Sequence, residues 1–267
     1  MKRDAKGARR WVVKLGTGIL TNTSGQIDIP QIEQLAAQIA QLRERGHQVV
    51  VVSSGAVGCG MSLLKMKKRP TRMDELQACA AIGQPRLMRL YDEAFGRHGM
   101  RVAQVLVTYL DMDSRALYGN IQRTVERLLK TSAIVPIFNE NDVVSYEELV
   151  GARFGDNDQL SAHIAVLARA SRLIILSNIR GLATRSDGTG RLIKDVNGVD
   201  AKIEKLAGGT RSQTSVGGMV SKLKAARLVN SAGIPMQIAH GRQKDVLLSI
   251  CQGEDVGTMF HADKGKS

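Results

Sequence analysis

The sequence predicts an α/β fold, a three-layer αβα sandwich around a mostly parallel central sheet. Two observations lead to this prediction. Short apolar runs of strand length alternate along the 267 residues with longer stretches whose apolar residues recur at helical spacing. The apolar runs also contain few polar residues, which is typical of parallel strands that helices cover on both faces.

The first elements are predicted from three local signals. Residues 11–15 form an apolar run that ends at Gly16-Thr17-Gly18, so we expect a strand and then a turn. Residues 30–45 place Ile and Leu side chains on one helical face, and Gly46 is a stop signal. The four valines at 49–52 predict a buried strand that leads into a Ser-Ser-Gly-Ala segment.

The remaining elements repeat this alternation of helical and strand patterns. In chain order they are helix 74–95, strand 102–107, helix 114–129, strand 134–138, helix 159–170, strand 173–176, helix 219–232, strand 236–239, helix 245–251 and strand 258–260. A polar loop region runs through 184–190. No internal repeat, low-complexity linker or domain boundary is visible. We therefore predict one domain over 11–262, a basic extension over 1–10 and a tail over 263–267.

Composition narrows the class of protein. No apolar run approaches the length that spans a membrane, and no apolar signal segment follows the basic start. The three cysteines are far apart and form no CxxC motif, which argues against a disulfide scaffold or a zinc site. We expect a cytoplasmic protein without a membrane partner.

The formal net charge of +13 is high, but the basic residues are scattered along the chain. Aromatic residues make up only 3%, so few rings are available to stack on bases. We expect a basic surface that attracts anionic substrates, and no nucleic-acid partner.

Polar residues and small turn residues gather at the carboxyl ends of the predicted strands, where open α/β sheets bind their ligands. They are Lys14, Gly16, Ser54, Gly55, Ala56, Asn139, Asp142, Ser177 and Asn178. A second acidic cluster, 155–162, opens the helix at 159–170. Turns and helix N-caps explain one such cluster. Two clusters favour a site for a cationic amine, a metal ion or both, because carboxylates are not buried without partners.

A possible phosphate site lies at Gly217-Gly218-Met219-Val220-Ser221-Lys222, with two glycines at a helix start and a lysine one turn in. An ordinary helix entry with a surface lysine explains this pattern equally well. Lys14 and Lys222 would then flank a transferred phosphoryl group. The chain has no Walker motif and no protein-kinase HRD or DFG set, so neither class fits.

Five segments, taken in order, resemble the amino acid kinase family in its glutamate 5-kinase branch. They are 12–17, 53–57, 139–142, 155–162 and 217–222, and residues 257–260 resemble the family's final strand. The resemblance runs from about Trp11 to His261. It implies the family's open αβα sandwich and transfer of the γ-phosphoryl group of ATP to the side-chain carboxylate of L-glutamate, the first step of proline biosynthesis. It also implies Mg²⁺ with ATP, proline as a feedback inhibitor, and a homo-oligomer.

The resemblance also implies residue roles. Lys14 and Lys222 would neutralise charge on the transferring phosphoryl group, and Asp158 would hold both ammonium groups; these three are the catalytic set. Glutamate would contact Ser54, Gly55, Ala56, Asn139, Asp142 and Asn157, with Asp142 as the partner of its α-ammonium group. ATP would contact Lys14, Gly16, Ser177, Asn178, Val216, Gly217, Gly218, Met219, Val220, Ser221 and Lys222. No residue is assigned as a metal ligand.

The sequence departs from the family pattern on the nucleotide side. Asn178 stands where an acid is usual and Ala183 where an aromatic ring is usual, and Ser215 and Val216 replace a frequent Gly and Thr. We therefore expect weak discrimination between nucleotide bases. Many relatives carry a C-terminal PUA domain, and we expect none here.

Two other classes share parts of this pattern. An N-acetylglutamate kinase-like member would have the same fold and lysines, but its substrate has no free ammonium group for the acidic clusters. A non-catalytic sensor of glutamate or proline would explain the altered nucleotide loop, but it would have no use for Lys14, Asp158 and Lys222 together.

Overall fold

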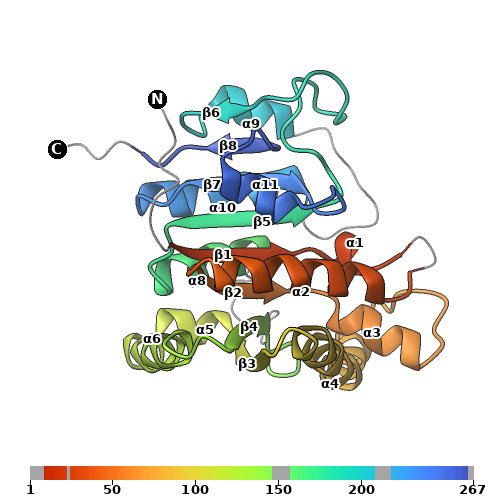
Figure 1. The fold of residues 1–267 in the computed structure, drawn as a ribbon. Helices are drawn as coiled ribbons and strands as arrows, with labels where there is room; N and C mark the ends of the chain where they lie inside the picture. Colours follow the sequence, from red (N-terminus) through yellow and green to blue (C-terminus); the bar gives the residue numbers. More distant parts are fainter. Residues whose placement is uncertain (1–8, 23–24, 146–156, 208–217, 264–267) are drawn as a thin grey trace.

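The computed structural model describes residues 9–22, 25–145, 157–207 and 218–263. The strands are β1 (Arg10–Leu15), β2 (Gln48–Ser53), β3 (Arg101–Val107), β4 (Ile134–Glu140), β5 (Arg172–Ser177), β6 (Asp195–Val196), β7 (Met236–His240) and β8 (Thr258–Phe260). Within the described residues they form one sheet in the order β3-β4-β2-β1-β5-β7-β8-β6, which Figure 1 shows from bottom to top. Neighbouring strands are parallel except for the antiparallel pair β7 and β8, so the mostly parallel sheet is confirmed.

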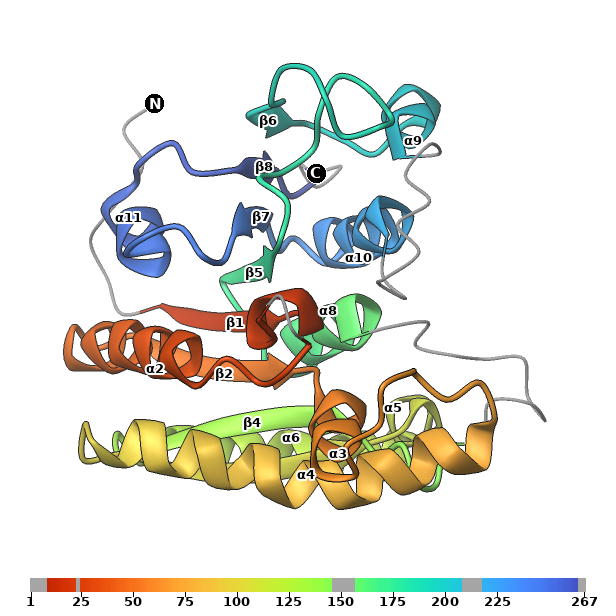
Figure 2. The ribbon, with the colours of Figure 1, turned by 90° about the vertical axis from the view of Figure 1, so that its right-hand side faces the viewer.

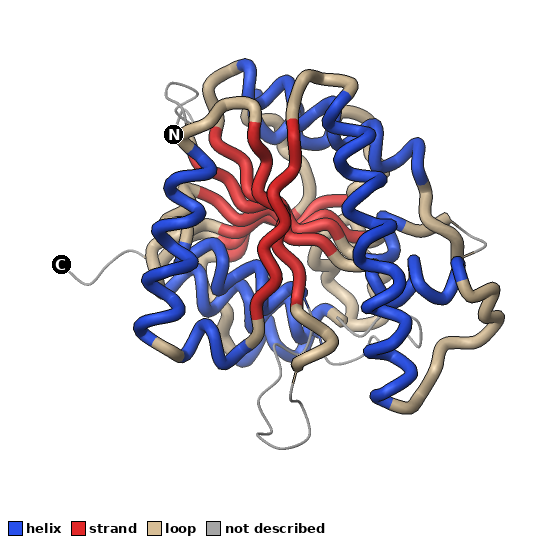
Figure 3. The backbone as a smooth tube through the Cα atoms, turned by 90° about the horizontal axis from the view of Figure 1, so that it is seen from below, coloured by secondary structure: helices blue, strands red, loops and turns tan. Residues whose placement is uncertain are grey.

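Helices cover both faces of this sheet. They are α1 (Thr17–Leu20), α2 (Ile29–Glu44), α3 (Ala56–Leu63), α4 (Met73–Gly96), α5 (Tyr109–Asp113), α6 (Arg115–Leu129), α8 (Asn157–Leu167), α9 (Ala201–Ala207), α10 (Met219–Ser231) and α11 (Val246–Gln252). Figure 2 shows α2 and α11 on one side of the strands and α8 and α10 on the other. Figure 3 shows the twisted strands with helices along both sides. The predicted αβα sandwich is confirmed.

Two apolar cores lie between the sheet and the helices, one on each face of the sheet. Alternate side chains of a strand point to opposite faces. Val13 of β1 therefore packs in the core formed with α2, α4 and α11, whereas Val12 packs in the core formed with α6, α8 and α10. By the same alternation, Lys14 points to the face that α8 and α10 cover. This direction is what brings its ammonium group to the site described below.

Several elements differ from the sequence prediction. Gly16 is the N-cap of the short helix α1, where a turn was expected. Helix α3 was not predicted, because its glycines lower helix propensity, and α5, α9 and β6 were missed because they are short. The helix expected at 159–170 spans Asn157–Leu167 instead, and Arg169 just after it has a positive φ of 49°.

The carboxyl ends of four neighbouring strands carry most of the predicted site. Strands β4, β2, β1 and β5 lie side by side in the sheet and run in the same direction. The strand expected at 134–138 extends to Glu140, so Asn139 lies within β4 and not beyond it. None of the described helices is both long and apolar enough to cross a membrane.

Candidate active site

Three charged side chains meet near the carboxyl ends of the strands. Lys14 lies in β1, Asp158 in the first turn of α8 and Lys222 in the first turn of α10. Lys14 Nζ is 2.6 Å from Asp158 Oδ1, and Lys222 Nζ is 2.8 Å from Asp158 Oδ2. Asp158 is 0% exposed, and the two lysines are 7% and 4% exposed. One buried carboxylate therefore joins two ammonium groups that come from opposite ends of the chain.

The electrostatics of this triad keep the carboxylate ionised. Burial by itself would raise the pKa of Asp158, but the charges and hydrogen bonds of Lys14 and Lys222 outweigh burial and lower the pKa below its ordinary value of 3.8. Two cations share one anion, so the triad has one surplus positive charge. Such a surplus suits it to attract an anionic group such as a phosphate.

The glycine next to Lys14 leaves room for such a group. A Cβ atom on Gly16 would lie 3.4 Å from Lys14 Nζ and 3.4 Å from the Leu176 carbonyl oxygen. The Gly16 N–H donates to that carbonyl at 3.3 Å, so it is already engaged within the protein. Gly16 thus keeps the approach to the ammonium group open.

The start of α10 forms the second part of the predicted nucleotide side. Gly218 is the N-cap residue of this 13-residue helix and makes no side-chain cap hydrogen bond, and the N-terminus of a helix favours an anion. Met219 is buried in the apolar core, while Val220 is 49% exposed on the outer face. Ser221 is half-buried. Val216 and Gly217, also predicted to contact ATP, lie outside the described residues.

Ser177 and Asn178 lie beside α1, the short helix that follows β1. Ser177 ends β5, and its hydroxyl donates to Asn178 Oδ1 at 3.3 Å. A Cβ atom on Gly18 would be 3.5 Å from the Asn178 side-chain amide. Two of the predicted nucleotide residues therefore lie against α1, one strand away from Lys14.

An amide network forms the other half of the site. The Asn157 side-chain amide donates to Ser54 Oγ at 2.9 Å and to Asn139 Oδ1 at 3.0 Å, and it also donates to the carbonyl of Ser53. Gly55, with φ of 100°, makes the turn from β2 into α3, a conformation that side-chain-bearing residues rarely adopt. Ser54, Asn139 and Asn157 are thus brought into direct contact.

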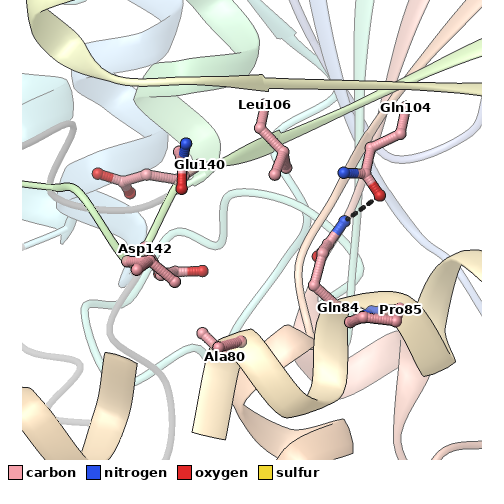
Figure 4. Close-up of a pocket in the computed structure, with 10 residues that line it drawn as sticks. Ala80, Gln84, Pro85, Gln104, Leu106, Glu140 and Asp142 are labelled. Atoms are coloured by element: carbon pink, nitrogen blue, oxygen red, sulfur yellow. Dashed lines mark hydrogen bonds between the residues drawn. The ribbon is translucent and has the colours of Figure 1, made fainter. Parts of the chain in front are cut away.

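A cavity of about 290 Å³ lies at the end of β4 (Figure 4). Its lining combines apolar side chains with three amides and two carboxylates, and it contains no Lys or Arg among the described residues. The lining residues are Ala80, Ala81, Gln84, Pro85, Gln104, Leu106, Glu140, Asn141, Asp142 and Val143. Asp142, predicted to meet an ammonium group, is therefore placed in an acidic cavity. Residues 155 and 156 of the second acidic cluster lie outside the described residues.

Sequence patterns did not identify Gln84 and Gln104 as site residues. Both line the cavity, and the Gln84 side-chain amide donates to Gln104 Oε1 at 3.4 Å, as the dashed line in Figure 4 marks. Neither glutamine follows a strand end or a glycine turn, the two signals that pointed to the other residues. Only the packing of α4 against β3 and β4 brings them to the site.

The described residues do not form a metal site of their own. No group of three or more His, Cys, Asp or Glu side chains is arranged there to hold a metal ion. Both Asp158 oxygens are already paired with lysines. The donor set therefore does not fit a metal ion held by protein ligands alone.

Comparison with known proteins gives sequence relatives across the whole chain. The amino acid kinase family model matches residues 9–240. A glutamate 5-kinase of Clostridium perfringens is 41% identical, with all of both chains covered. Glutamate 5-kinases of Azoarcus sp. and Thermus thermophilus are each 44% identical; they match 98% and 97% of this chain and 71% and 69% of their own lengths.

Solved structures show the same fold at low sequence identity. A UMP kinase of Bacillus anthracis superposes with a TM-score of 0.64 at 14% identity, over 97% of this chain and 98% of its own. A carbamate kinase of Giardia lamblia bound to AMP-PNP has a TM-score of 0.66 at 15% identity, over 96% and 99%. These two comparisons concern the fold alone.

Proposed function

The chain belongs to the amino acid kinase family, among the glutamate 5-kinases, and from this premise we propose that it transfers the γ-phosphoryl group of ATP to the side-chain carboxylate of L-glutamate. The product is L-glutamyl 5-phosphate, and the reaction is the first step of proline biosynthesis.

The observation that supports this reaction most directly is the charge of the two ends of the site. The buried triad of Lys14, Asp158 and Lys222 has a net positive charge, whereas Glu140 and Asp142 line a cavity without a basic residue among its described lining. β2 separates β1 from β4, so the two ends are roughly 10 Å apart at ordinary strand spacing. Glutamate has the matching character, with a carboxylate at one end and an α-ammonium group at the other.

The chemistry requires positioning and charge neutralisation. A side-chain carboxylate of glutamate is ionised at neutral pH, so its oxygen attacks the γ-phosphorus without a general base. A new O–P bond forms while the bond from the γ-phosphorus to the β,γ-bridging oxygen breaks, and ADP leaves with that electron pair. Lys14 and Lys222 stabilise the charge on the phosphoryl oxygens and the leaving oxygen. Asp158 holds both ammonium groups in place.

The nucleotide would lie over Gly16, Ser177, Asn178 and the start of α10. Mg²⁺ belongs to this proposal only as a companion of ATP, because the described residues do not supply a ligand set for it. No step is assigned to the ion.

The glutamate end would be formed by Ser54, Gly55, Ala56, Asn139, Asp142 and Asn157. Asp142→Ala should raise the KM for glutamate at least about tenfold, as expected when a charged partner of the ammonium group is lost, and leave the KM for ATP within about threefold. Asp92→Ala is the matched control, because Asp92 pairs with Arg101 near the opposite end of β3. A shift in the KM for ATP without one for glutamate would show that the two subsites are exchanged.

The reaction itself is tested by trapping the acyl phosphate with hydroxylamine in the presence of ATP. Parallel assays with glutamate and N-acetylglutamate separate the proposed function from that of an N-acetylglutamate kinase. An acidic cavity favours the substrate with a free ammonium group, so glutamate should be turned over and N-acetylglutamate should not. Turnover of N-acetylglutamate alone would overturn the substrate assignment.

Regulation and assembly complete the proposal. Proline, which also carries an ammonium group next to a carboxylate, would compete with glutamate as a feedback inhibitor, and inhibition kinetics at several glutamate concentrations test this. A homo-oligomer is proposed as well. Leu63, Leu64 and Ile82, at 51%, 49% and 42% exposure, give α3 and α4 an exposed apolar surface that fits self-association. Light scattering measures the subunit number.

A further inference from the structure

We propose that Gln84 of α4 is a positioning residue for glutamate: it holds Asn139 and, through Asn139, the amide of Asn157. This inference rests on the proposed function, since it concerns the site at which glutamate is proposed to bind. Gln84 acts through neighbouring side chains and not on the reacting atoms.

The first step of the argument is the hydrogen bond between Gln84 and Asn139. Asn139 Nδ2 donates to Gln84 Oε1 at 2.9 Å. Asn139 is 3% exposed, so its amide hydrogens depend on protein partners and not on bulk water. Its Oδ1 accepts from the Glu140 N–H and from Asn157 Nδ2, each at 3.0 Å. Gln84 therefore completes the set of bonds that fixes the plane of the Asn139 amide.

The second step is the direction of the Gln84 amide. Gln84 Nε2 donates to Gln104 Oε1 at 3.4 Å, so the opposite atom, Oε1, faces Asn139. Figure 4 shows Gln84 reaching toward Gln104 on one side of the cavity, with Glu140 and Asp142 on the other. A series of amides thus leads from Gln104 through Gln84 and Asn139 to Asn157. It ends at Ser54, which Asn157 contacts directly.

The third step is the close packing of α4 against α3. A Cβ atom on Gly83 would lie 1.9 Å from the Ala56 carbonyl oxygen, and one on Gly60 would lie 1.9 Å from the Cys79 carbonyl oxygen. Because neither side chain could fit, α3 and α4 touch through their backbones at both glycines. Adjacent residues of α4 therefore contact the first residue of α3 and hold Asn139. One turn of α4 therefore carries both Gly83, which contacts Ala56 of α3, and Gln84, which accepts a hydrogen bond from Asn139.

The central experiment compares Gln84→Met with Gln84→Glu. Methionine keeps the size of the side chain but removes the acceptor, so the KM for glutamate should rise about tenfold while kcat and the KM for ATP stay within about threefold. Gln84→Glu keeps an acceptor oxygen and should leave the KM for L-glutamate within about threefold of its wild-type value. Gln122→Met is the matched control. Gln122 is equally half-buried and donates to a backbone carbonyl of α8, and its loss should leave all three constants unchanged.

A double variant isolates the route through Asn139. In an Asn139→Ala background, Gln84→Met should have no further effect on the KM for glutamate, because the bond it removes no longer exists. If Gln84→Met does not fold, Gln84→Ala takes its place in the same comparisons. A merely structural role for Gln84 would lower kcat and raise both KM values together.

The outcomes also separate this inference from the proposed function. If Asp142→Ala raises the KM for glutamate and Gln84→Met does not, the positioning role is overturned and the glutamate site stands. If neither variant changes that KM, the proposed glutamate site itself is refuted. Equal damage by Gln84→Glu and Gln84→Met would overturn the positioning role as well, because the acceptor would then not be the cause.

Discussion

Replacing Asp158 by asparagine should lower the free energy of unfolding by about 3–5 kcal/mol, the typical cost of removing one partner from a buried ion pair. Asp158 is 0% exposed and pairs with Lys14 and Lys222 at 2.6 and 2.8 Å. Asparagine has nearly the same shape, so the packing of α8 would survive. Two almost fully buried ammonium groups would lose their shared counter-charge, and water cannot replace it.

Urea unfolding followed by circular dichroism measures this loss. Asp195→Asn is the control, because Asp195 pairs with His261 on the surface, at 50% and 41% side-chain exposure, and such pairs contribute up to about 1 kcal/mol. The triple variant Lys14→Met, Asp158→Leu, Lys222→Met should recover most of the stability, since apolar residues often replace a buried ion pair without cost. A loss below about 1 kcal/mol in Asp158→Asn would refute the reasoning.

The same carboxylate gives a pH dependence with a defined sign. The pKa of Asp158 is lowered in the folded protein, because the attraction of Lys14 and Lys222 exceeds the opposing effect of burial. Its contribution to stability is therefore complete above the unfolded-state value of 3.8 and is lost as the pH falls through the lower folded-state pKa. Wild type should lose more stability than the triple apolar variant over that acidic range.

Three further predictions concern catalysis, the nucleotide and the α3–α4 contact. Lys14→Ala or Lys222→Ala should lower kcat at least roughly 100-fold, as for loss of one charge-stabilising group; near wild-type turnover in a folded variant would contradict the assignment. The kcat/KM ratio of ATP over GTP should stay below roughly 100, about 2.7 kcal/mol, because Asn178 and Ala183 offer neither a charge nor a ring to the base; a larger ratio would show that the pocket selects adenine. Gly83→Ala should cost about 1–3 kcal/mol in urea unfolding, since its Cβ would meet the Ala56 carbonyl oxygen at 1.9 Å; unchanged stability would show that the helices separate easily.

Local patterns were sufficient to predict most strands and the position of many site residues along them. The valines at 49–52, for example, lie within β2 and are fully buried. A parallel strand covered on both faces excludes polar residues, and this exclusion is visible in the sequence itself. The site residues follow such strands, so their neighbourhood at one edge of the sheet could also be expected.

Other features depend on contacts between distant segments. Local sequence patterns do not indicate that Asp158 bonds both lysines. The family resemblance implied this pairing, and its geometry requires α8 and α10 to pack on the face to which Lys14 points. Helix α3 is rich in glycine and therefore has weak helix propensity. One of these glycines, Gly60, lies in close contact with the backbone of α4 at Cys79.

Hydrophobic periodicity and turn residues within a few positions were enough to predict the order of strands and helices along the chain, the αβα layering and the residues at the strand ends. The resemblance implied that Asp158 holds Lys14 and Lys222, and the packing of separate elements supplies that geometry. The hydrogen bonds that link Gln84 to Asn157 through Asn139 are visible in the folded structure and not in the sequence. The two kinds of feature differ in how far apart in the sequence the residues that produce them lie. Periodicity acts over a few residues of one element, whereas a hydrogen bond needs two atoms within about 3 Å, a condition that only the packing of separate elements can meet.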